Sequence, residues 1–228
     1  MELRYERNIP ALTEVECLLL REKRVLVVGC GGLGGHIIDQ LARLGLGMLR
    51  VADGDVFEPS NLNRQLLCSV PALGVNKAKA AADHVARVNP DVTVEAVPGF
   101  LTEANASDLI EGCDAVLDAL DNVPSRKLLA SACARAGIPC VYGAVSGWVA
   151  QAGISMPGDH LIDRLFPENI EVRDKSVLSF TPALCAAMQT ALCTRLLLGR
   201  PVQTGTVYHF DLLHQEFEAI ALARPVNE

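Results

Sequence analysis

The stretch that decides the fold is RVLVVGCGGLGGHIIDQLARLGLGMLRVADGDVFEPSNLNRQ, residues 24–65. It begins with an apolar run at residues 25–28, too short for a helix, which passes directly into a glycine-rich turn. An amphipathic segment follows at residues 33–44, and then a second β-rich run at residues 48–52. A G-x-G-x-x-G pattern in this order of strand, turn, helix and strand predicts a nucleotide-binding site.

The glycine turn holds Gly29, Gly31, Gly32 and Gly34. Glycine lets the backbone approach a phosphate closely, and the start of the following helix points its unpaired N–H groups and positive dipole end at that phosphate. Asp53 lies 19 residues after Gly34, where a carboxylate can accept hydrogen bonds from both ribose hydroxyls. We therefore expect the turn and Asp53 to bind a nucleotide.

Length and composition favour one well-packed domain with an acidic surface. The chain has 228 residues, half of them hydrophobic, and a formal net charge of −7. This charge argues against general binding to nucleic acid or to an anionic membrane, because both need a basic surface. The charged N-terminus does not resemble a signal peptide, and polar residues interrupt the longest apolar stretch, residues 182–198. A cytoplasmic protein that does not cross a membrane is expected.

Strands and helices alternate through most of the chain. Beyond the opening stretch, we predict helices at residues 74–88, 102–111 and 124–136, and strands at 92–97, 115–120 and 138–144. This alternation indicates an α/β fold with a doubly wound, mostly parallel, Rossmann-like sheet.

The two ends of the chain complete a single predicted domain, residues 1–228. An N-terminal arm and a helix from Thr13 occupy residues 1–22, and the nucleotide-binding core occupies residues 23–145. Residues 146–228 are predicted to hold a strand at 148–156, a surface loop at 157–175 and an apolar helix ending at Leu198. An antiparallel hairpin at residues 206–210 and 215–220 is expected at one edge of the sheet.

Polar residues after the second strand suit a triphosphate better than a dinucleotide. The cations and amides in question are Asn61, Asn63, Arg64, Gln65, Lys77 and Lys79. A triphosphate carries about two more negative charges than the diphosphate of a dinucleotide, so this cluster favours ATP. Asp121 follows the fourth strand at the same sheet edge and could hold Mg²⁺, a hard ion that takes few protein carboxylates.

Four motifs carry a resemblance to a known family. The GCGGLG run, SNLNRQ at residues 60–65, GVNKAKA at 74–80 and DALDN at 118–122 resemble, in order and spacing, the ThiF/MoeB/HesA family, relatives of the ubiquitin-activating enzymes. The resemblance covers nearly the whole chain. It implies an ATP-dependent adenylyltransferase that activates the C-terminal glycine of a small ubiquitin-fold sulfur-carrier protein of thiamine or molybdopterin biosynthesis and releases pyrophosphate.

The resemblance also implies roles for individual residues. The nucleotide would contact Gly31, Gly32, Asp53, Ser60, Asn61, Arg64, Gln65, Lys77, Asp121 and Asn122. Of these, Asp53 would bind the ribose, Arg64 and Lys77 the phosphates, and Asp121 the magnesium. The N-terminal RYERN resembles a family arm whose second arginine, here Arg7, reaches the active site of the partner subunit. A homodimer with Arg64, Lys77, Asp121 and Arg7 as catalytic residues is therefore implied.

Two features depart from the pattern of many family members. Such members bind a structural zinc through two C-x-x-C pairs, but residues 161–164 here read LIDR and no second pair follows. We therefore predict no structural zinc. Some members also carry a cysteine in the crossover loop that takes up the carrier or sulfur. The nearest candidate here is Cys185, and its place in an apolar helix favours core packing.

Three other functions remain open on the sequence. The first is adenylation of another peptide or a small acid. The second is an NAD-dependent oxidoreductase, which would use the glycine turn and Asp53 but lacks a plausible pair of hydride-transfer residues. The third, a catalytically silent scaffold, is disfavoured because Arg64, Lys77 and Asp121 occur together.

Overall fold

The computed structural model describes residues 2–167 and 176–222. Its strands are β1 (Arg24–Val28), β2 (Met48–Ala52), β3 (Thr93–Val97), β4 (Ala115–Asp118), β5 (Cys140–Ser146), β6 (Val149–Ser155), β7 (Thr206–Asp211) and β8 (Glu216–Ala221). Its α-helices are α1 (Glu14–Leu20), α2 (Gly32–Leu44), α3 (Lys77–Val88), α4 (Ala106–Ile110), α5 (Val123–Ala136), α6 (Leu161–Leu165) and α7 (Phe180–Leu197). Short 3₁₀ helices are η1 (Leu3–Asn8), η2 (Pro59–Asn61) and η3 (Val70–Ala72). No helix in the described part of the chain has the length and apolar character needed to cross a membrane.

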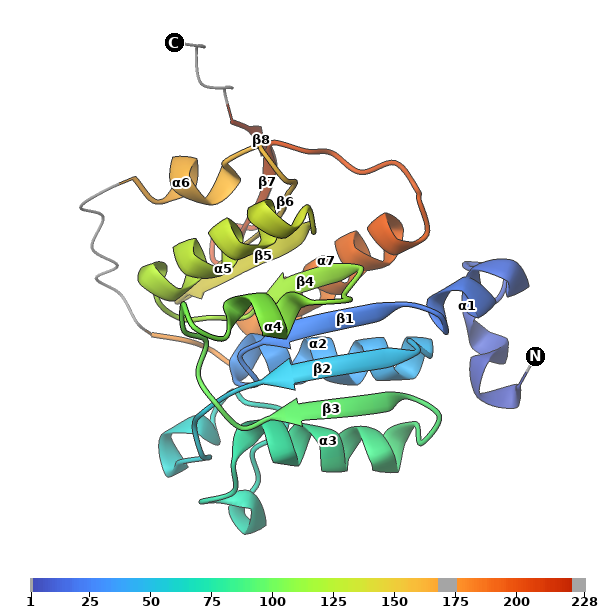
Figure 1. Cartoon of the computed structure of the whole chain (residues 1–228). Helices are drawn as coiled ribbons and strands as arrows, with labels where there is room; N and C mark the ends of the chain where they lie inside the picture. Colours follow the sequence, from blue (N-terminus) through green and yellow to red (C-terminus); the bar gives the residue numbers. More distant parts are fainter. Residues whose placement is uncertain (1, 168–175, 223–228) are drawn as a thin grey trace.

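These strands form one sheet in the order β3-β2-β1-β4-β5-β6-β7-β8 (Figure 1). The pairs from β3 to β5 are parallel, whereas β6, β7 and β8 join by antiparallel pairing. The predicted fold class, a doubly wound and mostly parallel sheet with antiparallel strands at the C-terminal edge, is confirmed.

Helices cover both faces of the parallel part of the sheet. Side chains of α2, α3 and α7 share one core cluster with Val25 and Val27, while those of α4 and α5 share another with Leu26 and Val28. Alternate residues of β1 thus face opposite cores, which explains why the strand is continuously apolar in sequence.

The order in which successive strands are added to the sheet reverses between β1 and β4. From β1 it proceeds outward to β2 and β3, and from β4 it proceeds the other way to β5. The glycine turn follows β1 and residues 119–122 follow β4, so both lie at this switch point. Open α/β sheets bind ligands in the crevice outside the carboxyl ends of the strands at such a point.

Several element boundaries differ from the prediction. The helix expected at residues 102–111 is only Ala106–Ile110, because Thr102 does not cap it: its N–H donates to Asn105 Oδ1 (2.8 Å) in a preceding turn. The strand expected at residues 115–120 ends at Asp118. The predicted surface loop at residues 157–175 contains α6, and residues 168–175 of it lie outside the described part.

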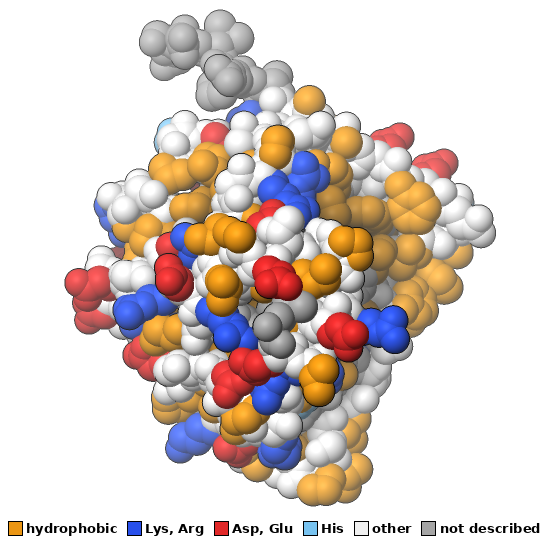
Figure 2. Space-filling model, turned by 90° about the vertical axis from the view of Figure 1, so that its right-hand side faces the viewer, with side chains coloured by type: hydrophobic (Ala, Val, Ile, Leu, Met, Phe, Trp, Pro, Cys, Tyr) orange, Lys and Arg blue, Asp and Glu red, His pale blue; other side chains and the backbone are white. Residues whose placement is uncertain are grey.

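The N-terminal arm docks at the amino ends of the strands. Tyr5 in η1 is buried, and its hydroxyl accepts a hydrogen bond from Asn89 Nδ2 (2.8 Å). Its ring lies against Gly45, where a Cβ would be 2.6 Å from the ring. This end of the sheet is opposite to the glycine turn (Figure 1). Figure 2 looks onto it and shows acidic and basic side chains interspersed, with no large basic patch.

Candidate functional site

The glycine turn is packed too tightly for side chains. Gly29 has φ +95°, and a Cβ there would lie 2.5 Å from the carbonyl oxygen of Ala119. A Cβ on Gly34 would lie 1.8 Å from the carbonyl oxygen of Gly29. Gly31, which has no side chain, precedes α2, so no N-cap side chain within residues 2–167 and 176–222 binds the first N–H groups of that helix. The turn can therefore offer them to an anion.

Residues from distant parts of the chain line this turn. A Cβ on Gly31 would lie 3.3 Å from Gln65 Nε2, and one on Gly32 would lie 3.6 Å from Pro182 Cβ and 3.9 Å from Arg64 Cγ. Gly31, Gly32, Arg64 and Gln65, all predicted from sequence, are thus brought together, and the start of α7 joins them.

Gln65 carries an unused acceptor beside the turn. Its side chain is buried, and Oε1 has no hydrogen-bond partner among the described residues. A buried polar atom without a partner costs free energy unless a ligand or water satisfies it. This atom is consistent with a polar ligand held against Gly31.

The SNLNRQ motif forms a compact turn that positions Arg64. Arg64 Nη1 donates to the Ser60 carbonyl oxygen (3.0 Å) and to Asn63 Oδ1 (2.8 Å). Asn61 is buried, and its Oδ1 accepts from the Glu58 N–H (3.1 Å). Asn61 therefore stabilises the turn, whereas the Ser60 side chain is exposed. That Ser60 and Asn61 contact a nucleotide remains a prediction.

Asp53 lies at the end of β2, directly against the glycine turn. Its Oδ2 accepts from the Cys30 N–H (2.7 Å), and its Oδ1 accepts from the Asp55 N–H (2.8 Å). Burial raises the pKa of this carboxyl group, while the two N–H donors and nearby Lys77 oppose that rise. These contacts hold both oxygens in place next to the site.

Lys77 is the first residue of α3, and its side chain is buried. Its Nζ lies 3.2 Å from Oδ2 of Asp55, a residue that the sequence analysis did not single out. A lysine at a helix N-terminus opposes the helix dipole, and the Asp55 carboxylate offsets this charge. The available sequence signal for the Lys77–Asp55 ion pair was the D-x-D spacing of Asp53 and Asp55 directly after a strand.

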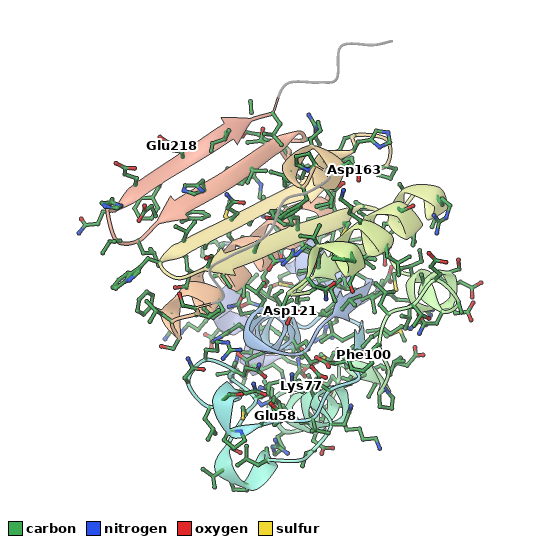
Figure 3. The ribbon with its side chains drawn as sticks, turned by 90° about the vertical axis from the view of Figure 1, so that its left-hand side faces the viewer. Glu58, Lys77, Phe100, Asp121, Asp163 and Glu218 are labelled. Atoms are coloured by element: carbon green, nitrogen blue, oxygen red, sulfur yellow. The ribbon has the colours of Figure 1, made fainter. Side chains whose placement is uncertain are left out.

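Asp121 and Asn122 follow β4 across the switch point. Asp121 is exposed, and its Oδ1 accepts from Asn122 Nδ2 (3.3 Å). Asn122 Oδ1 in turn accepts from the Ser125 N–H (2.9 Å) and caps α5. Figure 3 looks onto the carboxyl edge and shows Asp121 and Lys77 near its centre, away from Glu218 on β8.

The donor set suits a magnesium ion that is shared with a ligand. No group of three or more His, Cys, Asp or Glu side chains within residues 2–167 and 176–222 could hold a metal alone. Asp121 would instead supply one carboxylate, with phosphate oxygens and water completing the shell. Mg²⁺ is commonly bound in this way.

Two predicted candidates lie apart from this arrangement. Arg7 is exposed in η1, on the arm at the amino ends of the strands, and has no ion pair within the described residues. Cys185 is fully buried, and its Sγ donates to the Gln151 carbonyl oxygen (3.2 Å). Cys185 belongs to the core cluster, so its predicted packing in the core is confirmed. Burial also raises the pKa of this thiol to about 12.

The sequence analysis did not predict a buried ion pair between Asp118 and Arg126, which lies close to Asp121 in the chain. Arg126 Nη1 donates to Asp118 Oδ2 (2.9 Å), and both side chains are almost fully buried. Burial raises the pKa of Asp118, and the Arg126 charge opposes this rise. The available signal was an aspartate ending an apolar strand, with an arginine eight residues later in the next helix.

Comparison with known proteins identifies the family. The sequence profile of the ThiF family matches residues 5–228. The chain belongs to the ThiF family. The described fold of this ThiF-family protein is similar to the crystal structure of Escherichia coli MccB with ATP, which has a TM-score of 0.86 and 20% sequence identity over 99% of this chain and 73% of that one.

Curated relatives of this family member are named as activating enzymes or adenylyltransferases. It is 38% identical to the SAMP-activating enzyme E1 of Haloferax volcanii, over 88% of this chain and 77% of that protein. It is 33% identical to the molybdopterin-synthase adenylyltransferase of Salmonella typhimurium, over 90% and 85% respectively. It also matches mouse adenylyltransferase and sulfurtransferase MOCS3 with 36% identity, but spans only half the length of that protein.

Proposed function

We propose that the protein is an ATP-dependent adenylyltransferase that activates the C-terminal glycine of a small ubiquitin-fold sulfur-carrier protein. The carrying observation is the convergence of Arg64, Gln65 and Pro182 on the glycine turn, with Asp53 held against the same turn. The names of relatives similar over most of their length, including the molybdopterin-synthase adenylyltransferase, support this chemistry. A carrier of thiamine or molybdopterin biosynthesis is the proposed substrate.

The cations of the site account for the chemistry. The carrier carboxylate attacks the α-phosphorus of ATP, forming an acyl adenylate while the bond to pyrophosphate breaks. This step brings two anions together, and fixed positive groups lower its barrier by neutralising the transition state and the leaving pyrophosphate. Arg64 and Lys77 supply such charge from the protein. The carboxylate is already ionised at neutral pH, so no general base is needed.

The remaining residues hold the substrates in place. Asp53 is proposed to accept hydrogen bonds from the ribose, and the free Gln65 Oε1 to accept one from the nucleotide or its water. Asp121 would hold Mg²⁺, which supplies charge neutralisation at the phosphates when bound. Holding the two reactants in line contributes much of the remaining rate enhancement.

A homodimer would add a third cation, Arg7, to the Arg64 and Lys77 of each site. Arg7 lies on an arm anchored at the amino ends of the strands by Tyr5 and Asn89, so it does not approach the glycine turn of its own chain. We propose that it enters the site of a second copy. The carrier tail is proposed to pass beneath residues 157–175, part of which lies outside the described residues.

Carrier-dependent exchange of labelled pyrophosphate into ATP tests the proposal. The purified protein is mixed in turn with thiamine-type and molybdopterin-type carriers, and with variants of each that lack the terminal glycine. Exchange with an intact carrier and none with its truncated form is expected. Exchange supported equally well by short peptides without a ubiquitin fold would favour the broader peptide or small-acid activity.

The oxidoreductase alternative has a separate and simple test. Titration of the protein with NADH would enhance nicotinamide fluorescence if the glycine turn and Asp53 served a dinucleotide. We expect no saturable enhancement at concentrations where ATP binds. Saturable NADH binding by a protein that does not bind ATP would contradict the adenylyltransferase proposal.

A further inference from the structure

The strands β4 and β5 separate at the carboxyl edge, just below Asp121. Their last paired residues are Leu117 and Val141. Beyond this pair, Arg126 enters the gap from α5 and Gln189 enters from α7, helices that belong to the core clusters on opposite faces of the sheet. Arg126 is 5% exposed and Gln189 is 0% exposed. Two buried polar side chains therefore fill a place where apolar packing would be the simpler solution.

Arg126 bonds to several groups around this gap. Its Nη1 donates to Asp118 Oδ2 (2.9 Å) and to the Gly143 carbonyl oxygen (2.6 Å), and its Nη2 donates to the Leu120 carbonyl oxygen. The guanidinium carbon also lies 5.3 Å from the centre of the Tyr142 ring. The planar fork of arginine can make these bonds at once, which lysine cannot.

Gln189 connects the same two strands from the other face. Its Nε2 donates to the carbonyl oxygens of Asp118 (2.9 Å) and Val141 (3.1 Å). A Cβ on Gly143 would lie 2.2 Å from Gln189 Cδ, so the glycine leaves the space that this side chain occupies. The gap is thus built to admit Gln189.

The Arg126 and Gln189 contacts fix the chain before Asp121, and the cap of α5 fixes it after Asp121. The Leu120 N–H donates to Asp118 Oδ1 (2.9 Å), and the Leu120 carbonyl oxygen accepts from Arg126. On the other side, Asn122 is fixed as the cap of α5. The Asp121 carboxylate itself stays exposed. A ligand group presented from a fixed backbone loses less conformational freedom when it binds.

We propose that Arg126 and Gln189 are positioning residues that set the Asp121 carboxylate for a nucleotide-bound magnesium ion. They act through the Leu120 peptide and the Asp118 backbone, and neither touches the nucleotide. This inference rests on the proposed adenylyltransferase function, because it gives Asp121 its role. If the inference is correct, replacing Arg126 or Gln189 reduces the gain in ATP affinity that Mg²⁺ provides. The affinity for ATP without metal should change little.

Calorimetric titration with ATP, once with Mg²⁺ and once with EDTA, tests this inference without any carrier. The measured quantity is the ratio of the two dissociation constants, EDTA over Mg²⁺. Arg126→Lys and Gln189→Met should each lower this ratio about 10-fold or more, as losses of groups that orient metal ligands typically do. Affinity in EDTA should stay close to that of the unmodified protein. Arg135→Lys is the matched control, because Arg135 lies on the same helix but is exposed and donates to Ser131 Oγ.

A double variant separates positioning from general destabilisation. Asp121→Asn should lower the ratio directly, and adding Arg126→Lys to it should lower the ratio no further if Arg126 acts through Asp121. If Arg126→Lys does not fold, Gln189→Met in the same comparison carries the test. An unchanged ratio in the folded variants would overturn the positioning role alone, whereas absence of ATP binding by the unmodified protein would overturn the proposed function.

Discussion

The two lysines in the first turn of α3 differ in environment although they are two residues apart. Lys77 is buried and pairs with Asp55, whereas Lys79 is exposed. Burying a lysine beside a carboxylate is a costly way to stabilise a helix terminus. We therefore expect the Lys77 charge to act on a bound ligand, as the proposed function requires.

We expect Lys77→Met to abolish most activity while the fold remains. The change keeps the apolar stem and removes the charge, so carrier-dependent pyrophosphate exchange should fall about 100- to 1000-fold, equivalent to about 2.7–4 kcal/mol of transition-state stabilisation. Lys79→Met is the control and should retain exchange close to normal. Equal losses in both variants, or a parallel fall in melting temperature for Lys77→Met, would indicate a structural role.

Thiol labelling provides a second test at this scale. All eight cysteines are described, and seven of them are buried; Cys68 is the exception, with intermediate exposure. Because the thiolate is the reactive form and burial raises the pKa of Cys185 to about 12, we expect alkylation of the native protein at pH 8 to modify Cys68 and spare Cys185. Mass spectrometry of digested protein reads this out. Rapid labelling of Cys185 would reopen its role as a nucleophile.

At the scale of elements, one carboxylate on α1 binds Arg200, which lies in the segment that follows α7. Glu16 completes the capping box with Thr13, and its carboxylate also binds Arg200 (Nε to Oε1, 2.7 Å; Nη2 to Oε2, 2.8 Å). Hydrogen bonds from Arg200 and from the Thr13 N–H lower the pKa of Glu16 from 4.5 to about 2. A lowered carboxyl pKa means that this contribution to stability is complete above about pH 4.5 and is lost between pH 4.5 and 2.

Acid should therefore loosen α1 before the central sheet. We expect the hydrogen-exchange protection factors of α1 amides to fall between pH 5 and 3, after correction for intrinsic exchange. In Glu16→Gln these factors should be lower at pH 5 and should change little over the same interval. Protection of α1 that follows the same pH course in both proteins would contradict this assignment.

The close packing of the glycine turn predicts a sharp difference between two glycines. In Gly34→Ala the new Cβ would meet the Gly29 carbonyl oxygen at 1.8 Å, so the turn must move. We expect this overpacking to cost about 1–3 kcal/mol of unfolding free energy and to weaken ATP binding. Gly99→Ala, with nothing within 4 Å of the new Cβ, should change neither quantity appreciably in denaturant titrations and calorimetry.

For the whole molecule, the arm that carries Arg7 and the glycine turn lie at opposite ends of the sheet (Figure 1). If Arg7 acts in a partner's site, mixed dimers of Arg7→Ala and Lys77→Met chains contain one site with both defects and one with neither. Co-refolding equal amounts of the two variants should then restore about a quarter of normal exchange, although each variant alone is inactive. Failure to restore exchange in demonstrated mixed dimers would refute this contribution.

Much of this architecture follows from local patterns. The apolar run of β1, the glycine turn and the alternation of elements were sufficient to predict the parallel part of the sheet, because its central strands β1 and β4 are buried on both faces. The antiparallel edge was predicted separately, from the hairpin pattern at residues 206–220. The grouping of Arg64 and Gln65 with Gly31 and Gly32 followed from strand ends that share one edge. The short helix α4 was mispredicted because Asn105, rather than Thr102, precedes it and its side chain bonds backward.

What could not be predicted depends on contacts distant in sequence. Lys77 with Asp55 spans 22 residues, and Gln189 with Asp118 spans 71. Neither pair has a periodic signature, because each is selected by where two elements meet in space. From sequence alone, Gln189 is a single polar residue in an apolar helix, with no indicated role. Its role becomes clear only in the structure, where it donates to the carbonyl oxygens of Asp118 in β4 and Val141 in β5.

The position of α7 has a consequence for synthesis on the ribosome. Pro182 packs against Gly32, and Gln189 links β4 to β5 by hydrogen bonds. A nascent chain that has emerged only as far as β6 therefore contains the glycine turn but lacks both of these contacts from α7. Such a chain exposes the apolar surface that α7 later covers. Competence to retain nucleotide should therefore appear only after α7 has been synthesised and has docked against the first strand-turn-helix unit.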